Sequence, residues 1–170
     1  DFVGSIDRVD VDAHGRAVVV DYKHKGKGGF AAEYDVFGEG GCPAADAIAL
    51  PRRVQSLIYA QVVRRMFPDL RVVGAVYLST MGAGEGDHEI AGVVDANALD
   101  MVTGPISAPR AARLCVGGHG QATFEEILDV TEEKVASAIQ RMLDGDIEAD
   151  PTDDKACSWC PVVDCERRRG

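Results

Sequence analysis

The pattern of apolar and polar positions along the chain predicts an α/β fold. Strict alternation over residues 3–11 and 17–23 is typical of two short β-strands, and the turn between them favours an antiparallel hairpin. A strongly apolar run over residues 71–80 predicts a strand in the centre of a sheet, and residues 88–94 predict another. Apolar side chains at helical spacing predict helices over residues 51–67, 107–115 and 123–144.

Local signals indicate where the two longest predicted helices begin and end. Pro51 lies in the first turn of the helix over 51–67. The predicted apolar stripe of that helix consists of Val54, Leu57, Ile58, Val62 and Met66. Thr123 and Glu126 form a capping box at the start of the helix over 123–144, and Gly145 ends it. Residues 24–46 form a long glycine-bearing loop in this prediction.

Three charged side chains stand out in the predicted hairpin. Asp21 and Lys23 share a face of the second strand, roughly 7 Å apart, and antiparallel pairing would bring Asp7 next to Asp21. Two carboxylates in a half-buried site repel each other unless a cation or a proton lies between them, and hard oxygen ligands suit Mg²⁺ or Mn²⁺. The structural alternative is an ordinary salt bridge from Asp7 to Lys23 or Arg8, with Asp21 as a solubilising edge-strand residue.

Gln55 and Tyr59 form a second candidate pair. They are four positions apart in a predicted helix, so their side chains lie on one helix face. Taken by themselves, these residues equally fit a hydrogen-bonded pair on a helix that packs against the sheet.

The end of the chain carries a cysteine cluster. Cys157, Cys160 and Cys165 lie within nine residues, and thiolates at this density typically bind zinc or an iron–sulfur cluster. Cys42 and Cys115 are candidate fourth ligands, although each also fits a free thiol or a small core residue. If no fourth thiolate is supplied, the alternative is a disulfide between Cys160 and either Cys157 or Cys165.

Composition fits one domain with an acidic surface. The chain has 170 residues, 46% of them hydrophobic, and no run approaches the roughly 20 apolar residues of a membrane span. The net charge of −10 opposes nucleic-acid binding through overall charge, but it does not oppose a local basic channel. The cations expected to contact DNA are Lys25, Lys27, Arg52 and Arg53, with ordinary solvated residues as the alternative.

Three motifs in order, together with the cysteine cluster, resemble the nuclease core of the PD-(D/E)XK superfamily, in particular its RecB-like branch and the AddB-type helicase–nuclease subunits. They are G-S-I-D-R-V-D at residues 4–10, V-V-D-Y-K at 19–23 and Q-S-L-I-Y at 55–59. The resemblance implies a restriction-endonuclease-like α/β core, with a mixed central sheet flanked by helices over residues 1–150. Residues 151–170 would be a cysteine-rich tail of the same domain.

The resemblance also implies roles for individual residues. Asp7 and Asp21 would bind Mg²⁺ or Mn²⁺, and Lys23 would orient the attacking water or stabilise charge on phosphorus. Gln55 and Tyr59 would contact or position the substrate backbone beside the metal.

In the family, a [4Fe-4S] cluster is held by three C-terminal cysteines and one cysteine before the core. Here the gap between Cys160 and Cys165 is one residue shorter than usual, and no upstream cysteine is present. The chain opens directly into the first active-site strand, so we expect a fragment without the family's N-terminal helix. In such a fragment the cluster could be absent or replaced by zinc.

The resemblance therefore implies a cytoplasmic, metal-dependent DNA exonuclease domain in double-strand break repair and recombination. It would act within an AddAB/RecBCD-like complex, with an AddA-like helicase–nuclease subunit as partner and no membrane association. One alternative is a Cas4-like CRISPR-associated exonuclease. Another is a non-catalytic DNA-binding or scaffolding domain, although the presence of Asp7, Asp21 and Lys23 argues against it.

Overall fold

A computed structural model of the chain describes residues 3–26, 29–37, 41–49, 51, 53–81, 89–102, 108–146, 148, 156–162 and 165. The chain forms two compact units, Asp1–Val135 and Ala136–Gly170. The strands are β1 (Arg8–Val11), β2 (Arg16–Lys23), β3 (Arg71–Ser79), β4 (Ile90–Asp95) and β5 (Cys115–Val116). The α-helices are α1 (Phe30–Tyr34), α2 (Gln55–Met66), α3 (Ala108–Leu114), α4 (Phe124–Leu143) and α5 (Ala156–Trp159), and two 3₁₀ helices are η2 (Ala45–Ala47) and η3 (Ala96–Met101).

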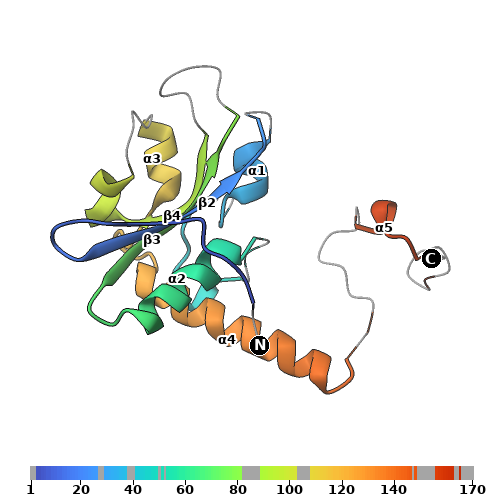
Figure 1. Cartoon of the computed structure of the whole chain (residues 1–170). Helices are drawn as coiled ribbons and strands as arrows, with labels where there is room; N and C mark the ends of the chain where they lie inside the picture. Colours follow the sequence, from blue (N-terminus) through green and yellow to red (C-terminus); the bar gives the residue numbers. More distant parts are fainter. Residues whose placement is uncertain are drawn as a thin grey trace. The chain divides into compact units, whose positions relative to one another are not determined.

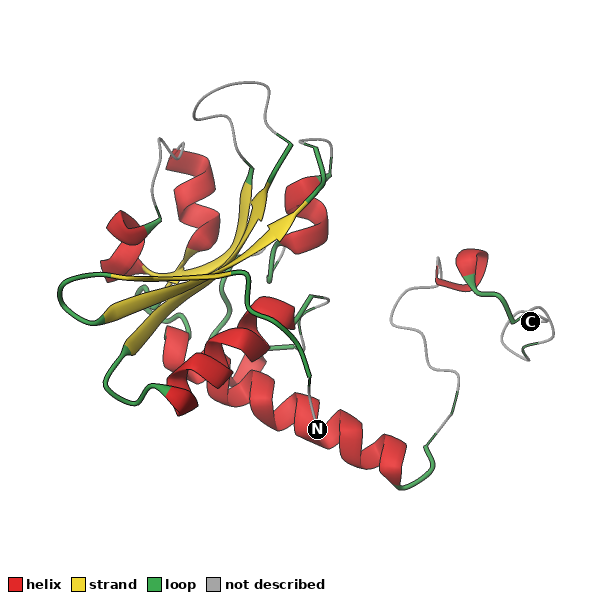
Figure 2. Cartoon of the chain, in the orientation of Figure 1, coloured by secondary structure: helices red, strands yellow, loops and turns green. Residues whose placement is uncertain are grey.

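The strands form one mixed sheet in the order β1-β2-β3-β4-β5 (Figures 1 and 2). β1 pairs with β2 and β3 with β4 in antiparallel fashion, whereas β2–β3 and β4–β5 are parallel. The parallel β2–β3 pair needs a crossover, and the intervening segment supplies it with α1 and α2. The predicted hairpin and the central place of the apolar strand β3 are both confirmed.

The first strand is shorter than the predicted span of 3–11. β1 begins at Arg8, and residues 3–7 lie outside it. The Tyr22 backbone N–H donates a hydrogen bond to Asp7 Oδ2 at 2.9 Å. If β1 were longer, this N–H would instead bond to a backbone carbonyl of β1. A side chain therefore replaces the ladder at this position, and Asp7 is an exposed residue just before the strand.

The alternation in β2 divides the core as its pattern predicts. Ala17 and Val19 belong to the core cluster that includes Leu57 of α2 and Ile127 near the start of α4. Val18 and Val20 face the opposite cluster, with Val94, Leu114 and parts of η3. Helices consequently cover both faces of the sheet, with α2 on one and α3 on the other (Figure 1).

The predicted stripe of α2 is rotated relative to the observed one. The helix begins at Gln55 rather than at Pro51, and its buried side chains are Ser56, Leu57, Ala60, Gln61 and Val63. Val62 and Met66 are 37% and 66% exposed. Two neighbouring rows of side chains along this helix are apolar. The row that contains the small side chain of Ala60 packs against the sheet, because it lets the helix axis come closer to the strands.

The start of α4 agrees with its sequence signals. Thr123 Oγ1 accepts from the Glu126 N–H at 3.2 Å, and Glu126 Oε2 accepts from the Thr123 N–H at 2.8 Å, which is a reciprocal capping box. The helix ends at Leu143, and Gly145 has a φ of +87°, a left-handed conformation that favours glycine.

Several short elements were not predicted. The predicted loop over 24–46 contains α1 and the start of η2, and Cys115 lies in β5 rather than at a helix end. These elements are too short to carry a periodic pattern, so tertiary packing decides them. No helix in the described ranges is long and apolar enough to span a lipid bilayer.

Candidate active site

The end of β2 places a buried carboxylate beside an ammonium group. Asp21 is 3% exposed, and its Oδ2 lies 2.6 Å from Lys23 Nζ. The contact is an ion pair by distance, but its alignment falls short of a hydrogen bond, and no described residue supplies another donor to Oδ2. A buried carboxylate oxygen without an aligned donor is costly unless a cation balances it.

Asp7 reaches the same end of the hairpin. The Arg8–Val20 pair is the last in the β1–β2 register, and its extension by one residue sets Asp7 across from Asp21. The bond from the Tyr22 N–H fixes the Asp7 carboxylate there. Among the described residues Arg8 pairs with Asp10 at 2.7 Å and Lys23 with Asp21, so Asp7 takes part in neither predicted alternative salt bridge.

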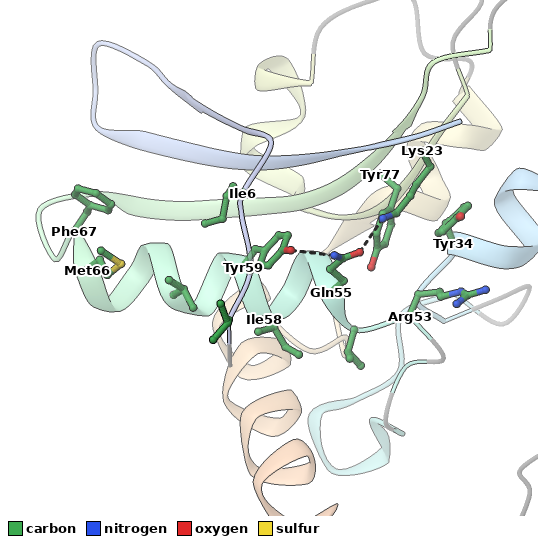
Figure 3. Close-up of a pocket in the computed structure, with 14 residues that line it drawn as sticks. Ile6, Lys23, Tyr34, Arg53, Gln55, Ile58, Tyr59, Met66, Phe67 and Tyr77 are labelled. Carbon is green, nitrogen blue, oxygen red and sulfur yellow. Dashed lines mark hydrogen bonds between the residues drawn. The ribbon is translucent and has the colours of Figure 1, made fainter. Parts of the chain in front are cut away.

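Lys23, Gln55 and Tyr59 form a hydrogen-bonded row (Figure 3). Lys23 Nζ donates to Gln55 Oε1 at 2.7 Å, and Gln55 Nε2 donates to Tyr59 Oη at 3.0 Å. Gln55 is the first residue of α2, so its side chain projects from the helix end nearest Lys23. The structure thus brings together the three motifs that the sequence separates.

Lys23 is also bounded by an aromatic ring that the sequence prediction missed. Its Nζ lies 5.7 Å from the centroid of the buried Tyr77 ring, within the range of a cation–π contact. Burial acts to lower the pKa of Lys23, but its ion pair with Asp21, with smaller charge effects of Tyr77 and Tyr34, raises its pKa overall. Lys23 is therefore a cation at neutral pH. Because Tyr77 lies in an apolar run, only the pairing of β3 with β2 identifies it.

A second group of side chains flanks the site from α1. The Tyr34 and Tyr77 rings pack with centroids 4.9 Å apart, and the Arg53 guanidinium lies 5.7 Å from the Tyr34 centroid. Glu33 accepts from Arg53 at 2.6 Å and also pairs with Lys25. The hydrogen bond from Lys25 is the main reason that the pKa of Glu33 is lowered. Glu33 and Tyr34 were not predicted as site residues.

Of the four cations predicted to contact DNA, two belong to the residues that the structure describes. Lys25 and Arg53 both lie at this flank, where the carboxylate of Glu33 neutralises part of their charge. Lys27 and Arg52 lie outside the described residues.

A pocket of about 850 Å³ opens beside the hydrogen-bonded row (Figure 3). Its polar end is formed by Lys23, Arg53 and Gln55, with the rings of Tyr34, Tyr59 and Tyr77. Its apolar end includes Ile6, Ile58, Val62, Met66 and Phe67. The exposed side chains of α2, including Val62 and Met66, therefore form one wall of this pocket.

The donor set fits a hard divalent cation. Asp7 and Asp21 supply two carboxylates at one end of the hairpin, and Asp21 Oδ2 is buried without an aligned donor. Mg²⁺ is commonly held by one or two carboxylates, with waters and substrate phosphates as its remaining ligands. In the described ranges no three His, Cys, Asp or Glu side chains gather as a metal site, so a cation here would depend on such additional ligands.

The cysteines do not form a ligand set among the described residues. None of the five takes part in a disulfide. Cys42 Sγ contacts the carbonyls of Pro43 and Ala122 at 3.4 and 3.6 Å, and burial raises the pKa values of both Cys42 and Cys115. In the metal-free protein, burial therefore disfavours the thiolate form of both side chains. Cys157 lies in α5, and Cys160 and Cys165 follow it.

Comparison with known proteins agrees with this geometry. A family model described as PD-(D/E)XK nuclease superfamily matches residues 1–165. No curated protein and no solved structure matches the chain significantly. The mixed five-stranded sheet flanked by helices has the architecture of a restriction-endonuclease-like α/β core. With its Asp7 and Asp21-Tyr22-Lys23 motifs meeting at one end of that sheet, the chain belongs to the PD-(D/E)XK nuclease superfamily.

Proposed function

We propose that this domain hydrolyses phosphodiester bonds of DNA in a reaction that depends on a divalent metal. The observation that carries the proposal is the contact of buried Asp21 with Lys23, whose hydrogen-bonded row with Gln55 and Tyr59 lines a pocket of about 850 Å³. A carboxylate beside a fixed ammonium and a pocket is suited to a reaction in which negative charge develops on phosphorus.

Each residue has a distinct task in this proposal. Asp7 and Asp21 hold the metal, which when bound would polarise the phosphate and lower the pKa of an attacking water. The Lys23 ammonium has three N–H donors, of which Gln55 engages one while Asp21 forms an ion pair, so a further donor is available to a phosphoryl oxygen. In this proposal Lys23 acts as a cation that stabilises the negative charge on the phosphoryl group. Tyr59 holds Gln55, and Gln55 in turn holds Lys23.

The biological setting that we propose is an exonuclease domain of AddB type. It would work in the cytoplasm with an AddA-like helicase–nuclease partner during double-strand break repair. The order of the motifs and the C-terminal cysteines support this setting. A Cas4-like exonuclease is the second candidate, because it shares the cysteine arrangement. The full-length gene product separates the two, since a large helicase-like region favours AddB and a small stand-alone protein favours Cas4.

The reaction is tested with end-labelled linear DNA and Mg²⁺ or Mn²⁺, using the full-length protein. We expect metal-dependent cleavage that Asp21→Asn and Lys23→Ala each reduce by at least roughly 100-fold. Asp100→Asn and Lys134→Ala are matched controls, because they change the same charges on exposed surfaces outside the site. Release of mononucleotides from the label indicates an exonuclease. Absence of cleavage would favour a DNA-binding or scaffolding domain.

The cysteine cluster is a separate part of the proposal. In the AddB setting, Cys157, Cys160 and Cys165 would contribute three ligands to a [4Fe-4S] cluster, with no step of the hydrolysis routed through it. Their close spacing supports this assignment, whereas the described residues do not bring them into a ligand set. Anaerobic purification followed by iron and zinc analysis tests it. Loss of iron in Cys157→Ala supports the cluster, and a protein free of both metals contradicts it.

A further inference from the structure

The start of α2 receives its hydrogen-bond cap from the central strand of the sheet. Val54, the N-cap residue, makes no side-chain cap, and the Ser56 hydroxyl is buried without a hydrogen-bond partner among the described residues. The first N–H groups of a helix have no partner within the helix and need one elsewhere. The Ser56 N–H donates to Tyr77 Oη at 3.1 Å.

The same tyrosine supports Lys23. In the parallel pairing of β2 with β3, Tyr77 lies directly beside Asp21. Asp21 and Lys23 are on one face of β2, and the Tyr77 ring lies under the Lys23 ammonium at 5.7 Å. Tyr77 is 1% exposed and packs with Phe30 and Ala91, so the ring itself is rigidly held.

Tyr77 therefore touches both sides of the hydrogen bond that joins Lys23 to Gln55. Its ring lies next to Lys23 (Figure 3). Its hydroxyl accepts a hydrogen bond from the backbone N–H of Ser56, the residue after Gln55. A shift of the α2 N-terminus would move Gln55 Oε1 away from Lys23 Nζ, which are 2.7 Å apart. Catalytic geometry tolerates such displacements poorly.

We infer that Tyr77 is a positioning residue of the nuclease site: it sets the distance between Lys23 and Gln55 by capping α2 from β3. The inference rests on the proposed nuclease function. The competing interpretation is that Tyr77 only fills the core, in which case its hydroxyl affects stability and not the reaction.

Tyr77→Phe isolates the hydroxyl because it keeps the ring and therefore the packing. We expect kcat to fall about 10-fold with KM changed less than about twofold, since the substrate still binds but Lys23 is misplaced. Exchange of the Ser56 amide hydrogen, followed by NMR, is expected to accelerate about 10-fold. Thr123→Ala is the matched control, because it removes a helix cap of α4 outside the site; it should lower the melting temperature similarly and leave kcat unchanged.

A double variant separates positioning from general destabilisation. If Tyr77 acts through Gln55, then Gln55→Ala with Tyr77→Phe should be no slower than Gln55→Ala alone. Losses that multiply in the double variant, or a Tyr77→Phe protein with wild-type kcat, would overturn the inference while leaving the nuclease assignment intact. A wild-type protein that does not cleave DNA would overturn the nuclease assignment and the positioning role of Tyr77 with it. An unchanged rate of hydrogen exchange at the Ser56 amide in Tyr77→Phe would show that the Tyr77 hydroxyl does not cap α2.

Discussion

Lys23 Nζ donates a 2.7 Å hydrogen bond to Gln55 Oε1, across 32 positions of sequence. The bond joins the last residue of β2, close to Asp21, to the first residue of α2. It restricts a long, flexible side chain to one orientation, in which its charge faces the pocket. The freedom of the lysine is therefore limited before any substrate binds.

Removal of the amide should affect the reaction more than the fold. Gln55 is exposed, so we expect Gln55→Ala to change the melting temperature little while kcat falls roughly 10- to 100-fold. Steady-state cleavage of labelled DNA measures this. Gln140→Ala is the control, because Gln140 is an exposed helical glutamine whose amide donates a hydrogen bond to Asp144, four residues further along the chain. Equal rates for the two variants would exclude a role for the Lys23–Gln55 bond.

Glu33 holds two of the cations that we expect to contact DNA. It pairs with Lys25 and with Arg53, so Glu33→Gln should release both charges toward the phosphate backbone. DNA binding, measured without a divalent metal, is expected to tighten about 3- to 10-fold at low salt and to depend more steeply on salt concentration.

Asp100→Asn is the charge-matched control for that substitution. It also removes one negative charge, but it acts at the opposite end of β2 and leaves Arg16 paired with Asp12. If both variants bind DNA equally, the effect is one of net charge and the Glu33 flank has no special role.

The charge of Lys23 should persist through the neutral and mildly alkaline range. Its pKa is raised above the ordinary value, so its stabilising ion pair is fully present below that value and is lost only as the pH rises through the folded-state pKa. The melting temperature of the metal-free protein between about pH 7 and about pH 9 should therefore show no loss from lysine deprotonation. A melting temperature that falls across this range in wild type but not in Lys23→Arg would contradict the raised pKa.

Gly92 allows β3 and β4 to approach closely. Its φ is +116°, and a Cβ at this position would lie 2.3 Å from the Ala75 carbonyl oxygen. Gly92→Ala should therefore lower the free energy of unfolding by about 3 kcal/mol through strain and a backbone clash. Urea unfolding measures the loss.

Gly120→Ala is the matched control for Gly92. Its φ is +75°, but a Cβ there would meet nothing within 4 Å. It should therefore lose only about 1 kcal/mol from the left-handed backbone. Similar losses for both variants would show that conformation, and not the contact with β3, limits position 92.

Much of the architecture was predictable from local patterns. The hairpin, the central strand β3 and the capped start of α4 follow from alternation, an apolar run and a capping box, and all three are confirmed. The rotation of α2 was not predictable, because two of its ridges are apolar and only the shape of the sheet selects between them. The length of β1 depends on Asp7 replacing a backbone carbonyl, which the alternation pattern does not contain.

The available chemistry, and the strand or helix face on which each group lies, can be read from the amino-acid sequence. Asp21 and Lys23 share a side of β2 because strand geometry alternates with a period of two, whatever surrounds the strand. The contact of Gln55 with Lys23 and the capping of α2 by Tyr77 arise only in the folded protein, since they join residues 32 and 21 positions apart. Such contacts depend on how helices pack and strands pair, and those choices are made by the fit of whole surfaces rather than by neighbouring residues.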